Sequence, residues 1–415
     1  MSVLQTLVCL VVIVKVSSGA NLKTRRDVDY RAKVVEILKT TPLIDGHNDV
    51  PFQLRRKYNN RFENFTFDHQ PTWHTDLPRL KRGMMGTQLW SAFAFCANRM
   101  KNAVRQGLEQ VAIIKRMTDK YPEDFQFVTT AQGIRDAKKA GKIGCMIGLE
   151  GGHMIDSSLA TLRMFYLLGV RYLTLTHSCH VPWASTCSAP KKTSHNGLNA
   201  FGRTVVMEMN RLGMMVDISH VSNVTMHDVL DVTKSPVIFS HSSAYALCKH
   251  PRNVPDDVLR RMPANGGLVM VNFANDYVIY NATRRGITVR LTDVADHIDY
   301  IKNVSGIDHV GIGADYDGVP YVPQGLEDVS KYPDLLAELM RRGYTEDDIK
   351  KVAGENLIRV LAKNEQIAEG MKNTRPYDEY QFYANVTCRP NFGGGYGAYT
   401  QRYKSYVKVS PINLS

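Results

Sequence analysis

The residues best suited to chemistry in this sequence are histidines and carboxylates that follow short apolar segments. In Leu43–Pro51, the run L-I-D-G-H-N-D-V-P places Asp45, His47 and Asp49 at alternate positions. Alternate side chains of a β-strand share one face, so we expect these three groups to point the same way. His47 and Asp49 are both ordinary zinc ligands, and a metal ion would satisfy them if they are buried. The same run is also compatible with a turn in which His47 is merely exposed.

Similar side chains end four further apolar segments of the chain. They are Glu150, His177, His220 and His241. One histidine at the end of a strand is usually a structural residue, but five such strand ends are improbable by chance. We therefore predict that a metal centre is formed by His47, Asp49, Glu150, His220 and His241.

This set contains only nitrogen and oxygen ligands, which suit zinc and also manganese or cobalt. Five protein ligands exceed what one catalytic zinc ion takes, because such an ion keeps a position open for water. Two ions that share a bridging carboxylate are the simplest solution, and Glu150 is the only glutamate in the set. Such ions lie about 3.5–4 Å apart, hold a bridging hydroxide and polarise a carbonyl. We expect a hydrolase.

The elements that would position these residues alternate between strand and helix. The segments with strand character are Leu43–Asp49, Thr87–Phe93, Cys145–Glu150, Arg171–His177, Met214–His220, Pro236–His241, Gly267–Phe273 and His309–Asp315. Segments of helical period lie between them, with Ser222, Thr292 and the cluster Asp156–Ser158 as helix starts. Eight alternations predict an α/β fold, a (β/α)8 TIM-like barrel of the metal-dependent hydrolase type, whose active site lies at the carboxyl ends of the strands.

Composition sets the broad class of the protein. The 415 residues are 44% hydrophobic and carry a formal net charge of +12, without a run of Lys and Arg long enough to suggest nucleic-acid binding. Residues 1–20 resemble a secretory signal, because Leu7–Val14 is apolar and Ser18–Ala20 offers small residues for cleavage. We expect a signal peptide over 1–20, the barrel over 21–372 and a C-terminal extension over 373–415.

Secretion would make two kinds of modification possible. We expect glycosylation at Asn64, Asn281, Asn303 and Asn385, all within N-x-S/T sequences. Asn413 has the same pattern, and so does Asn223, where a glycan three residues past His220 would crowd the site. Six cysteines follow the signal and could form disulfides, but their spacing alone assigns no pairs.

Several consecutive motifs resemble the membrane (renal-type) dipeptidases. They run from about Val34 to Leu361 and include L-I-D-G-H-N-D, L-E-G-G-H-M-I-D-S-S-L, R-Y-L-T-L-T-H-S-C, F-S-H-S-S-A-Y, R-N-V-P-D-D-V-L, D-Y-D-G-V-P and G-L-E-D-V-S-K-Y-P-D-L. The resemblance implies a zinc dipeptidase that acts on dipeptides with a free C-terminal carboxylate. It implies two Zn²⁺ per subunit, one held by His47 and Asp49, the other by His220 and His241, with Glu150 as the bridge.

The resemblance also implies roles for three further residues. His177 would contact the peptide carbonyl and stabilise the oxyanion, and Arg252 would bind the carboxylate of the substrate. Asp315 would transfer a proton from the bridging water to the leaving amine. From the residues alone, Arg252 is also compatible with a solvated loop charge, and Asp315 competes with Asp317 for the role. We expect His153 to orient its neighbours.

For the cysteines, the resemblance implies a Cys96–Cys179 disulfide and an inter-subunit bond through Cys388, hence a homodimer. Cys248 lacks its family partner and is either free or bonded to Cys145 or Cys187. Membrane-anchored relatives end in an apolar tail that is exchanged for a glycolipid, whereas this sequence ends V-K-V-S-P-I-N-L-S. We therefore expect a secreted or extracellular protein.

Two other functions are compatible with the same residues. One is a dinuclear-metal hydrolase of lactams or esters, since such barrels host many hydrolyses. The other is a non-catalytic member that keeps the fold for binding. Such members typically lose a ligand or the proton-transfer residue, and here every one of these residues is present.

Overall fold

Eight parallel strands form a closed ring in the computed structural model, which describes residues 29–189 and 196–378. The ring order is β2-β1-β9-β8-β7-β6-β5-β4, and pairing between β2 and β4 closes it. The strands are β1 (Leu43–Asn48), β2 (Met85–Phe93), β4 (Ile143–Glu150), β5 (Val170–Thr174), β6 (Met215–Asp217), β7 (Ile238–Phe239), β8 (Leu268–Val271) and β9 (Val310–Ile312). Each predicted strand is present, which confirms the (β/α)8 barrel.

One short strand lies outside the ring. β3 (Phe125–Phe127) pairs in parallel with the first residues of β4. At three residues it is too short to show an alternating pattern, which is why the sequence did not predict it.

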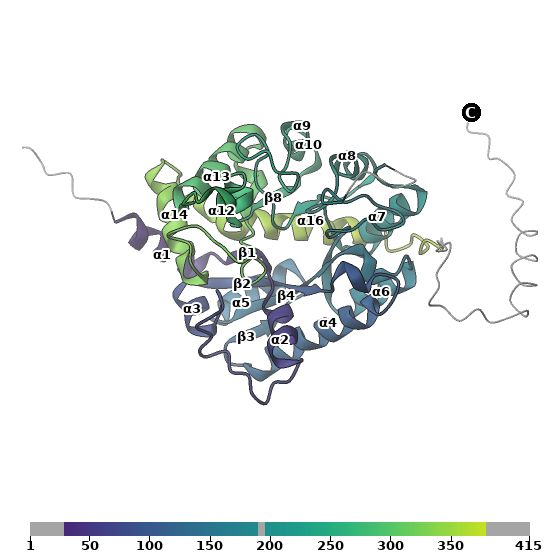
Figure 1. The fold of residues 1–415 in the computed structure, drawn as a ribbon, viewed down its shortest axis with the longest axis horizontal. Coiled ribbons are helices and arrows are strands. Elements are labelled where there is room, and N and C mark those ends of the chain that lie inside the picture. Colours follow the sequence, from purple (N-terminus) through teal and green to yellow (C-terminus); the bar gives the residue numbers. More distant parts are fainter. Residues whose placement is uncertain (1–28, 190–195, 379–415) are drawn as a thin grey trace, which may run out of the picture.

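Helices surround the ring on the outside (Figure 1). Those that occupy stretches of helical period between the predicted strands or after the last of them are α4 (Ala103–Lys120), α5 (Ala131–Lys139), α6 (Leu159–Leu167), α7 (Ala200–Leu212), α8 (Asn223–Val232), α9 (Asp256–Leu259), α13 (Leu291–Ser305), α14 (Tyr332–Arg341), α15 (Glu346–Lys350) and α16 (Asn356–Gly370). The others are α1 (Tyr30–Thr40), α2 (Val50–Tyr58), α3 (Leu77–Arg82), α10 (Met262–Asn265), α11 (Asn275–Val278) and α12 (Ala282–Arg285). Within the part of the chain that the structure describes, no helix is both long enough and apolar enough to cross a bilayer.

The helix starts agree with the sequence in two of three places. The Ser222 side chain accepts a hydrogen bond from the Thr225 amide, and Ser158 does the same for Thr161. The predicted N-cap at Thr292 is wrong, because α13 already begins at Leu291. There, the Asp293 carboxylate accepts from the amide of Arg290, and this contact at the first turn replaces the expected cap.

The interior of the barrel is filled with apolar side chains. Ile44, Leu89, Met146, Ile238 and Met270 belong to five different strands and form one buried cluster. Side chains from strands on opposite sides of a ring can meet only inside it, so this cluster fills the barrel below its carboxyl-end rim. The alternate residues of the same strands pack against the helices instead.

Candidate metal centre

The predicted ligands all lie at the carboxyl ends of their strands. His47 is the next-to-last residue of β1 and Asp49 directly precedes α2, while Glu150 is the final residue of β4. His220 and His241 follow β6 and β7 by three and two residues. All five side chains are buried, although every one of them is ionisable. Burial of such groups is costly unless they have partners, which makes this rim the candidate site.

Glu150 divides the cluster into two halves. Its Oε2 lies 3.4 Å from His47 Nε2, which in turn lies 3.3 Å from the Asp49 carboxylate. Its Oε1 lies 3.1 Å from His220 Nε2 and 3.4 Å from His241 Nε2. His47, Asp49 and Glu150 form one group able to hold a metal ion, and Glu150, His220 and His241 form another. One carboxylate thus presents a different oxygen to each half.

The strand that carries His47 breaks its alternation just before the site. The register between β1 and β2 shifts between Asp45 and Asn48. Consequently His47 and Asp49 share a face, but Asp45 does not join them as the alternation predicted. The Asp45 carboxylate instead accepts hydrogen bonds from the Tyr332 hydroxyl (2.7 Å) and the Ala314 amide (2.8 Å). A bulge of this kind re-aims a side chain, which is common near active sites.

Behind His47 lies a single hydroxyl group. His47 Nδ1 is 3.1 Å from the Tyr172 hydroxyl, which also reaches the carbonyl of Gly46. The Tyr172 ring occupies space that only a glycine leaves open, since a Cβ on Gly148 would lie 1.9 Å from it. A partner on Nδ1 fixes the ring and leaves Nε2 facing the carboxylates.

Behind His241 lies a network around Asp217. One Asp217 oxygen accepts from the hydroxyls of Ser240 (2.6 Å) and Thr174 (2.5 Å), and the other accepts from the amides of Ser219 and Ser240. Because the Ser240 hydroxyl donates its proton to Asp217, it accepts from His241 Nδ1, 2.7 Å away. The His241 Nε2 that faces Glu150 is then unprotonated, the form that binds a metal ion.

The charges of the cluster fit a cation. Burial, reinforced by Arg252, lowers the pKa of His220 well below its usual value, and burial does the same for His241, so both are neutral ligands. Burial opposes charge on Glu150, but the histidines around it, His47 foremost, outweigh it and hold the pKa of that carboxyl well below its usual value. His47 Nε2 is buried and makes no hydrogen bond. A divalent ion placed there would satisfy this nitrogen and the carboxylates together.

Three further predicted residues line the cavity in front of the cluster. The cavity measures about 280 Å³ and is lined by His177, Arg252 and Asp315 together with Asp49, Glu150 and His220. His177 Nε2 lies 3.9 Å from Glu150. The Arg252 guanidinium is buried and donates to the His241 carbonyl (3.1 Å) and the Ser242 hydroxyl (3.3 Å), while its Nε has no partner. Arg252 is therefore not the solvated loop charge that the residues alone allowed.

The geometry also distinguishes Asp315 from Asp317. The Asp315 carboxylate lies near His47 and His241 and accepts a hydrogen bond from Asn272 (2.8 Å). Burial raises the pKa of Asp315 to about 7. Asp317 faces away from the cluster and exchanges two hydrogen bonds with His74, from the His74 amide (2.8 Å) and to its Nδ1 (3.0 Å). Asp315 is thus the carboxylate that faces the cavity.

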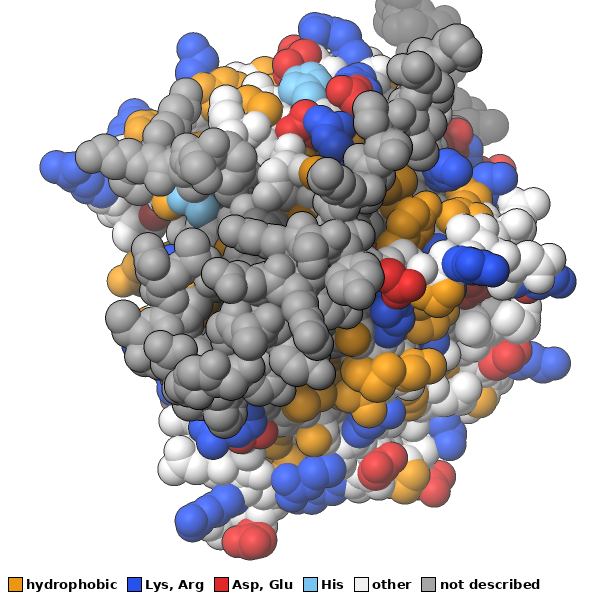
Figure 2. Space-filling model, turned by 90° about the vertical axis from the view of Figure 1, so that its right-hand side faces the viewer, with side chains coloured by type: hydrophobic (Ala, Val, Ile, Leu, Met, Phe, Trp, Pro, Cys, Tyr) orange, Lys and Arg blue, Asp and Glu red, His pale blue; other side chains and the backbone are white. Residues whose placement is uncertain are grey.

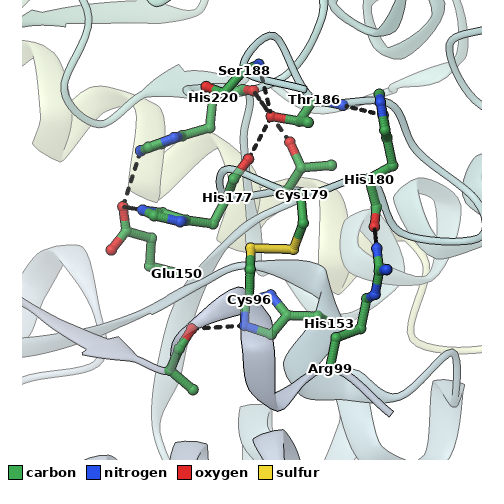
Figure 3. The surroundings of a disulfide bond; sticks show 12 residues. Cys96, Arg99, Glu150, His153, His177, Cys179, His180, Thr186, Ser188 and His220 are labelled. Atoms are coloured by element: carbon green, nitrogen blue, oxygen red, sulfur yellow. Dashed lines mark hydrogen bonds and ion pairs between the residues drawn. A yellow bond between two sulfur atoms is a disulfide. The ribbon is translucent and has the colours of Figure 1, made fainter. Parts of the chain in front are cut away.

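A disulfide supports the loop that carries His177 (Figure 3). Cys96, just after β2, is bonded to Cys179, just after β5. His153 lies beside this bond and its Nε2 donates to the carbonyl of Ala94 (2.8 Å), so it orients the loop after β2. Among the described residues, Cys145, Cys187 and Cys248 form no disulfide.

Some of the predicted residues lie beyond this region. Asn64, Asn223 and Asn303 are exposed and Asn281 is half-buried. The signal peptide, Asn385, Asn413 and Cys388 lie outside the described residues.

The residues that the sequence did not predict stand behind the ligands. Asp217 was visible as a charged residue inside the predicted strand Met214–His220, and a buried charge of this kind signals a supporting network. Tyr172 and Asn272 gave no comparable signal. Gly318, in D-Y-D-G, is a further case, since a Cβ there would lie 2.2 Å from the Asp49 carboxylate.

Comparison with known proteins places this geometry in a family. The model of the membrane dipeptidase family, peptidase family M19, matches residues 31–375. A metallo peptidase from Rhodobacter sphaeroides, liganded with a phosphinate mimic of the dipeptide L-Ala-D-Ala, is 28% identical with a TM-score of 0.73, over 78% of this chain and 99% of that one. Dipeptidase AC, a metallo peptidase of family M19, is 29% identical with a TM-score of 0.72 over the same shares. The probable dipeptidase PvdM from Pseudomonas aeruginosa, at 20% identity, TM-score 0.74 and 82% and 99% coverage, shares the fold.

Proposed function

The chain belongs to the membrane dipeptidase family, peptidase family M19, and on this premise we propose that it cleaves dipeptides with a free C-terminal carboxylate at a pair of zinc ions. It is a metallo-dipeptidase, a hydrolase of peptide bonds. The observation that carries the proposal is the division of Glu150 between two ligand groups. His47 and Asp49 would hold one ion, His220 and His241 the other. When bound, such a pair would supply an activated water at neutral pH and polarise the peptide carbonyl.

Arg252 would bind the carboxylate of the substrate. Its guanidinium lines the cavity, is fixed by two hydrogen bonds and keeps an unpartnered Nε. A planar guanidinium pairs with a carboxylate through two parallel hydrogen bonds, so it favours a free C-terminus over an amide or ester. This requirement also favours dipeptides over the lactams and esters of the alternative function.

His177 and Asp315 would act on the reacting bond. Burial lowers the pKa of His177, so it is a neutral imidazole that can donate a hydrogen bond to the carbonyl oxygen as negative charge develops there. Asp315, a buried carboxylate that lines the cavity beside the cluster, can accept a proton and release it again. It would receive the proton of the attacking water and deliver it to the leaving amine.

The setting of the enzyme belongs to the same proposal. The apolar run Leu7–Val14 and the Cys96–Cys179 disulfide support passage through an oxidising secretory compartment. We further propose N-linked glycans at Asn64, Asn281, Asn303 and Asn385, and a homodimer linked through Cys388.

The test is hydrolysis of L-Ala-D-Ala and a small panel of L,L-dipeptides by the purified protein, each compared with its C-terminal amide. We expect turnover of the acids, loss of activity with a chelator, recovery with zinc and about two zinc ions per subunit by elemental analysis. Arg252→Ala should mainly raise KM for the acids and narrow the difference between acid and amide. Arg261→Ala, at a surface ion pair with Asp231, is the matched control. Chelator-resistant turnover, or equal rates on acids and amides, would contradict the proposal.

A further inference from the structure

Two cysteines and a histidine beside the metal centre form a separate group of side chains able to hold a metal ion (Figure 3). The sulfur atoms of Cys96 and Cys179 and a ring nitrogen of His153 all lie within 4.8 Å of one another. Cys96 follows β2, His153 follows β4 and Cys179 follows β5. Because β4 pairs with both β2 and β5, the three loops are neighbours at the rim of the barrel. We call these three residues the Cys–His group.

His153 contributes an imidazole nitrogen that has no partner. The side chain is 1% exposed, its Nε2 donates to the carbonyl of Ala94 at 2.8 Å, and its Nδ1 is buried without a hydrogen bond. Because Nε2 carries the proton, Nδ1 keeps its lone pair, which is the form in which an imidazole binds a metal ion. A buried acceptor without a donor is costly, so this nitrogen needs an explanation.

The two sulfur atoms are joined in a disulfide that a reductant can reach. Both cysteines are half-buried, in contrast to His153. Reduction requires direct attack on a sulfur atom, so access decides which disulfides exchange. A dithiol reductant supplies two electrons and two protons, becomes a cyclic disulfide itself and leaves Cys96 and Cys179 as thiols.

From this geometry we propose that the Cys–His group, once its disulfide is reduced, is a further metal site that binds zinc or another thiophilic ion through two thiolates and one imidazole. The incoming ion displaces the two thiol protons to solvent, and water fills the fourth position. Two sulfur atoms that bind one zinc ion at about 2.3 Å lie roughly 3.8 Å apart. The opened disulfide therefore has to widen only to a separation that the group already spans.

The ligand chemistry of this site differs from that of the group around Glu150. Thiolates select zinc, cadmium and cuprous ions, whereas the predicted ligands of the catalytic centre offer only nitrogen and oxygen. A bound ion would replace the disulfide as the link between the loops after β2 and β5, and so hold the segment that carries His177, two residues before Cys179. The inference goes beyond the proposed function and does not depend on it, because none of its three residues is a predicted ligand of that centre.

Cobalt titration of the metal-loaded full chain tests the site. The protein is reduced with a phosphine, separated from the reductant without oxygen and titrated with Co²⁺ beside the oxidised form. We expect the reduced protein to bind one further ion per subunit, with the near-ultraviolet thiolate-to-cobalt charge-transfer absorption that nitrogen and oxygen ligands do not produce. Cys96→Ser should abolish this absorption. His153→Gln, which keeps an amide donor for Ala94, should weaken cobalt binding by about 100-fold or more, because a direct ligand contributes at least as much as a residue behind one.

Alkylation of the reduced protein identifies the thiols that bind the ion. Zinc should slow the alkylation of Cys96 and Cys179, whereas Cys187, which is half-buried and outside the group, should react at the same rate with and without zinc. Peptide mapping separates these thiols from Cys388, which reduction also releases if it links two subunits. Cys187→Ser is the matched control and should leave the cobalt absorption in place.

The outcomes are independent of dipeptide hydrolysis, so they are distinguishable from a failure of the proposed function. A further ion that requires both cysteines and His153 supports the site. The proposal is overturned if reduction adds no ion, if the absorption persists in Cys96→Ser or if His153→Gln binds cobalt as tightly as the unmodified protein. Circular dichroism follows the fold of the reduced protein. Unfolding that zinc does not reverse also overturns the proposal, because the site needs all three loops in place.

Discussion

The two halves of the metal centre are built in different ways. In one half, His47 and Asp49 are two residues apart at the carboxyl end of β1, and their common direction depends on a register shift in that strand. In the other half, His220 and His241 come from neighbouring strands, and their Nε2 atoms lie 3.0 Å apart. The first half is a local motif, whereas the second exists only once β6 and β7 have paired.

The residues that hold the ligand histidines in place also differ between the two halves. His47 has one hydroxyl behind it, that of Tyr172, and this half is otherwise fixed by space that Gly148 and Gly318 leave open. His241 has a buried network behind it, in which Asp217 accepts four hydrogen bonds from three residues. One half thus depends on steric fit and the other on hydrogen bonding. An added side-chain atom should therefore disrupt the first half, and loss of a hydrogen-bond acceptor should disrupt the second.

Glu150 belongs to both halves, so its loss should have the largest effect. Glu150→Gln keeps the shape but offers only one carbonyl oxygen, and we expect kcat to fall by on the order of a thousandfold or more. Zinc content should fall together with activity, while the circular dichroism spectrum stays unchanged. A variant that retains near-normal turnover would exclude the bridging role.

Steric fit in the first half can be tested at Gly318. In Gly318→Ala the new Cβ would lie 2.2 Å from the Asp49 carboxylate and 2.6 Å from that of Asp315. Both groups must move, and a displacement of about 1 Å at a reacting centre costs roughly a hundredfold in rate. The control is Gly370→Ala, where a Cβ meets no atom within 4 Å. If kcat/KM is the same in both variants, steric fit does not fix this half.

Hydrogen bonding in the second half can be tested at Asp217. Asp217→Asn replaces a carboxylate oxygen that accepts hydrogen bonds from the hydroxyls of Ser240 and Thr174. The Ser240 hydroxyl then no longer has a fixed direction as the acceptor for His241 Nδ1, and zinc binding should weaken by about 10- to 100-fold. Tyr172→Phe removes one longer contact from the first half and should have the smaller effect. Competition with a chromogenic chelator measures both. The reverse order would contradict the comparison.

The smallest expected effect concerns Asp317, which supports the loop of Asp315 without facing the cavity. Burial raises the pKa of Asp317 to about 7, so the folded chain keeps this proton where the unfolded chain has lost it. The folded state then binds more protons between about pH 4 and 7, and stability falls as pH rises through that range. Asparagine does not titrate, so Asp317→Asn removes this loss of stability. The Tm of the variant minus that of the unmodified protein should be a few degrees larger at pH 8 than at pH 5.

Thermal unfolding followed at the two pH values gives this difference directly. Glu63→Gln, at an exposed position, controls for the loss of a negative charge. An Asp317→Asn shift of the same size at both pH values would mean that the carboxyl does not titrate as its burial predicts.

The parts of the site that the sequence predicted share a simple pattern. The barrel and the convergence of its strand-end histidines and carboxylates could be predicted, because strand ends in a parallel barrel meet at one rim. His220 and His241 could therefore be placed together before any contact was known. The Asp45 interpretation was wrong because alternation assumes a regular strand, and the register shift before His47 is a tertiary effect. The roles of Tyr172 and Gly318 could not be predicted, because each depends on a contact between distant segments. Tyr172 contacts His47, and Gly318 leaves room for the Asp49 carboxylate.

Three phenylalanines that line the cavity show that residue types alone do not reveal which side chains will meet. Phe52, Phe93 and Phe95 were unremarkable as apolar residues of a strand and a helix. Their contact with one another depends on the pairing of β1 with β2, which brings Phe52 beside Phe93. Strand order follows from how the barrel closes, and no local property of these residues encodes it.

The packed interior of the barrel gives the catalytic cavity a closed lower end. Side chains such as Ile44, Met146 and Met270 leave no passage through the ring beneath the ligands. Both amino acids released by hydrolysis must therefore depart by the entrance through which the dipeptide arrived. A long polypeptide therefore cannot pass through the barrel and be cleaved repeatedly. Accumulating products occupy the same cavity entrance as the substrate and compete with it.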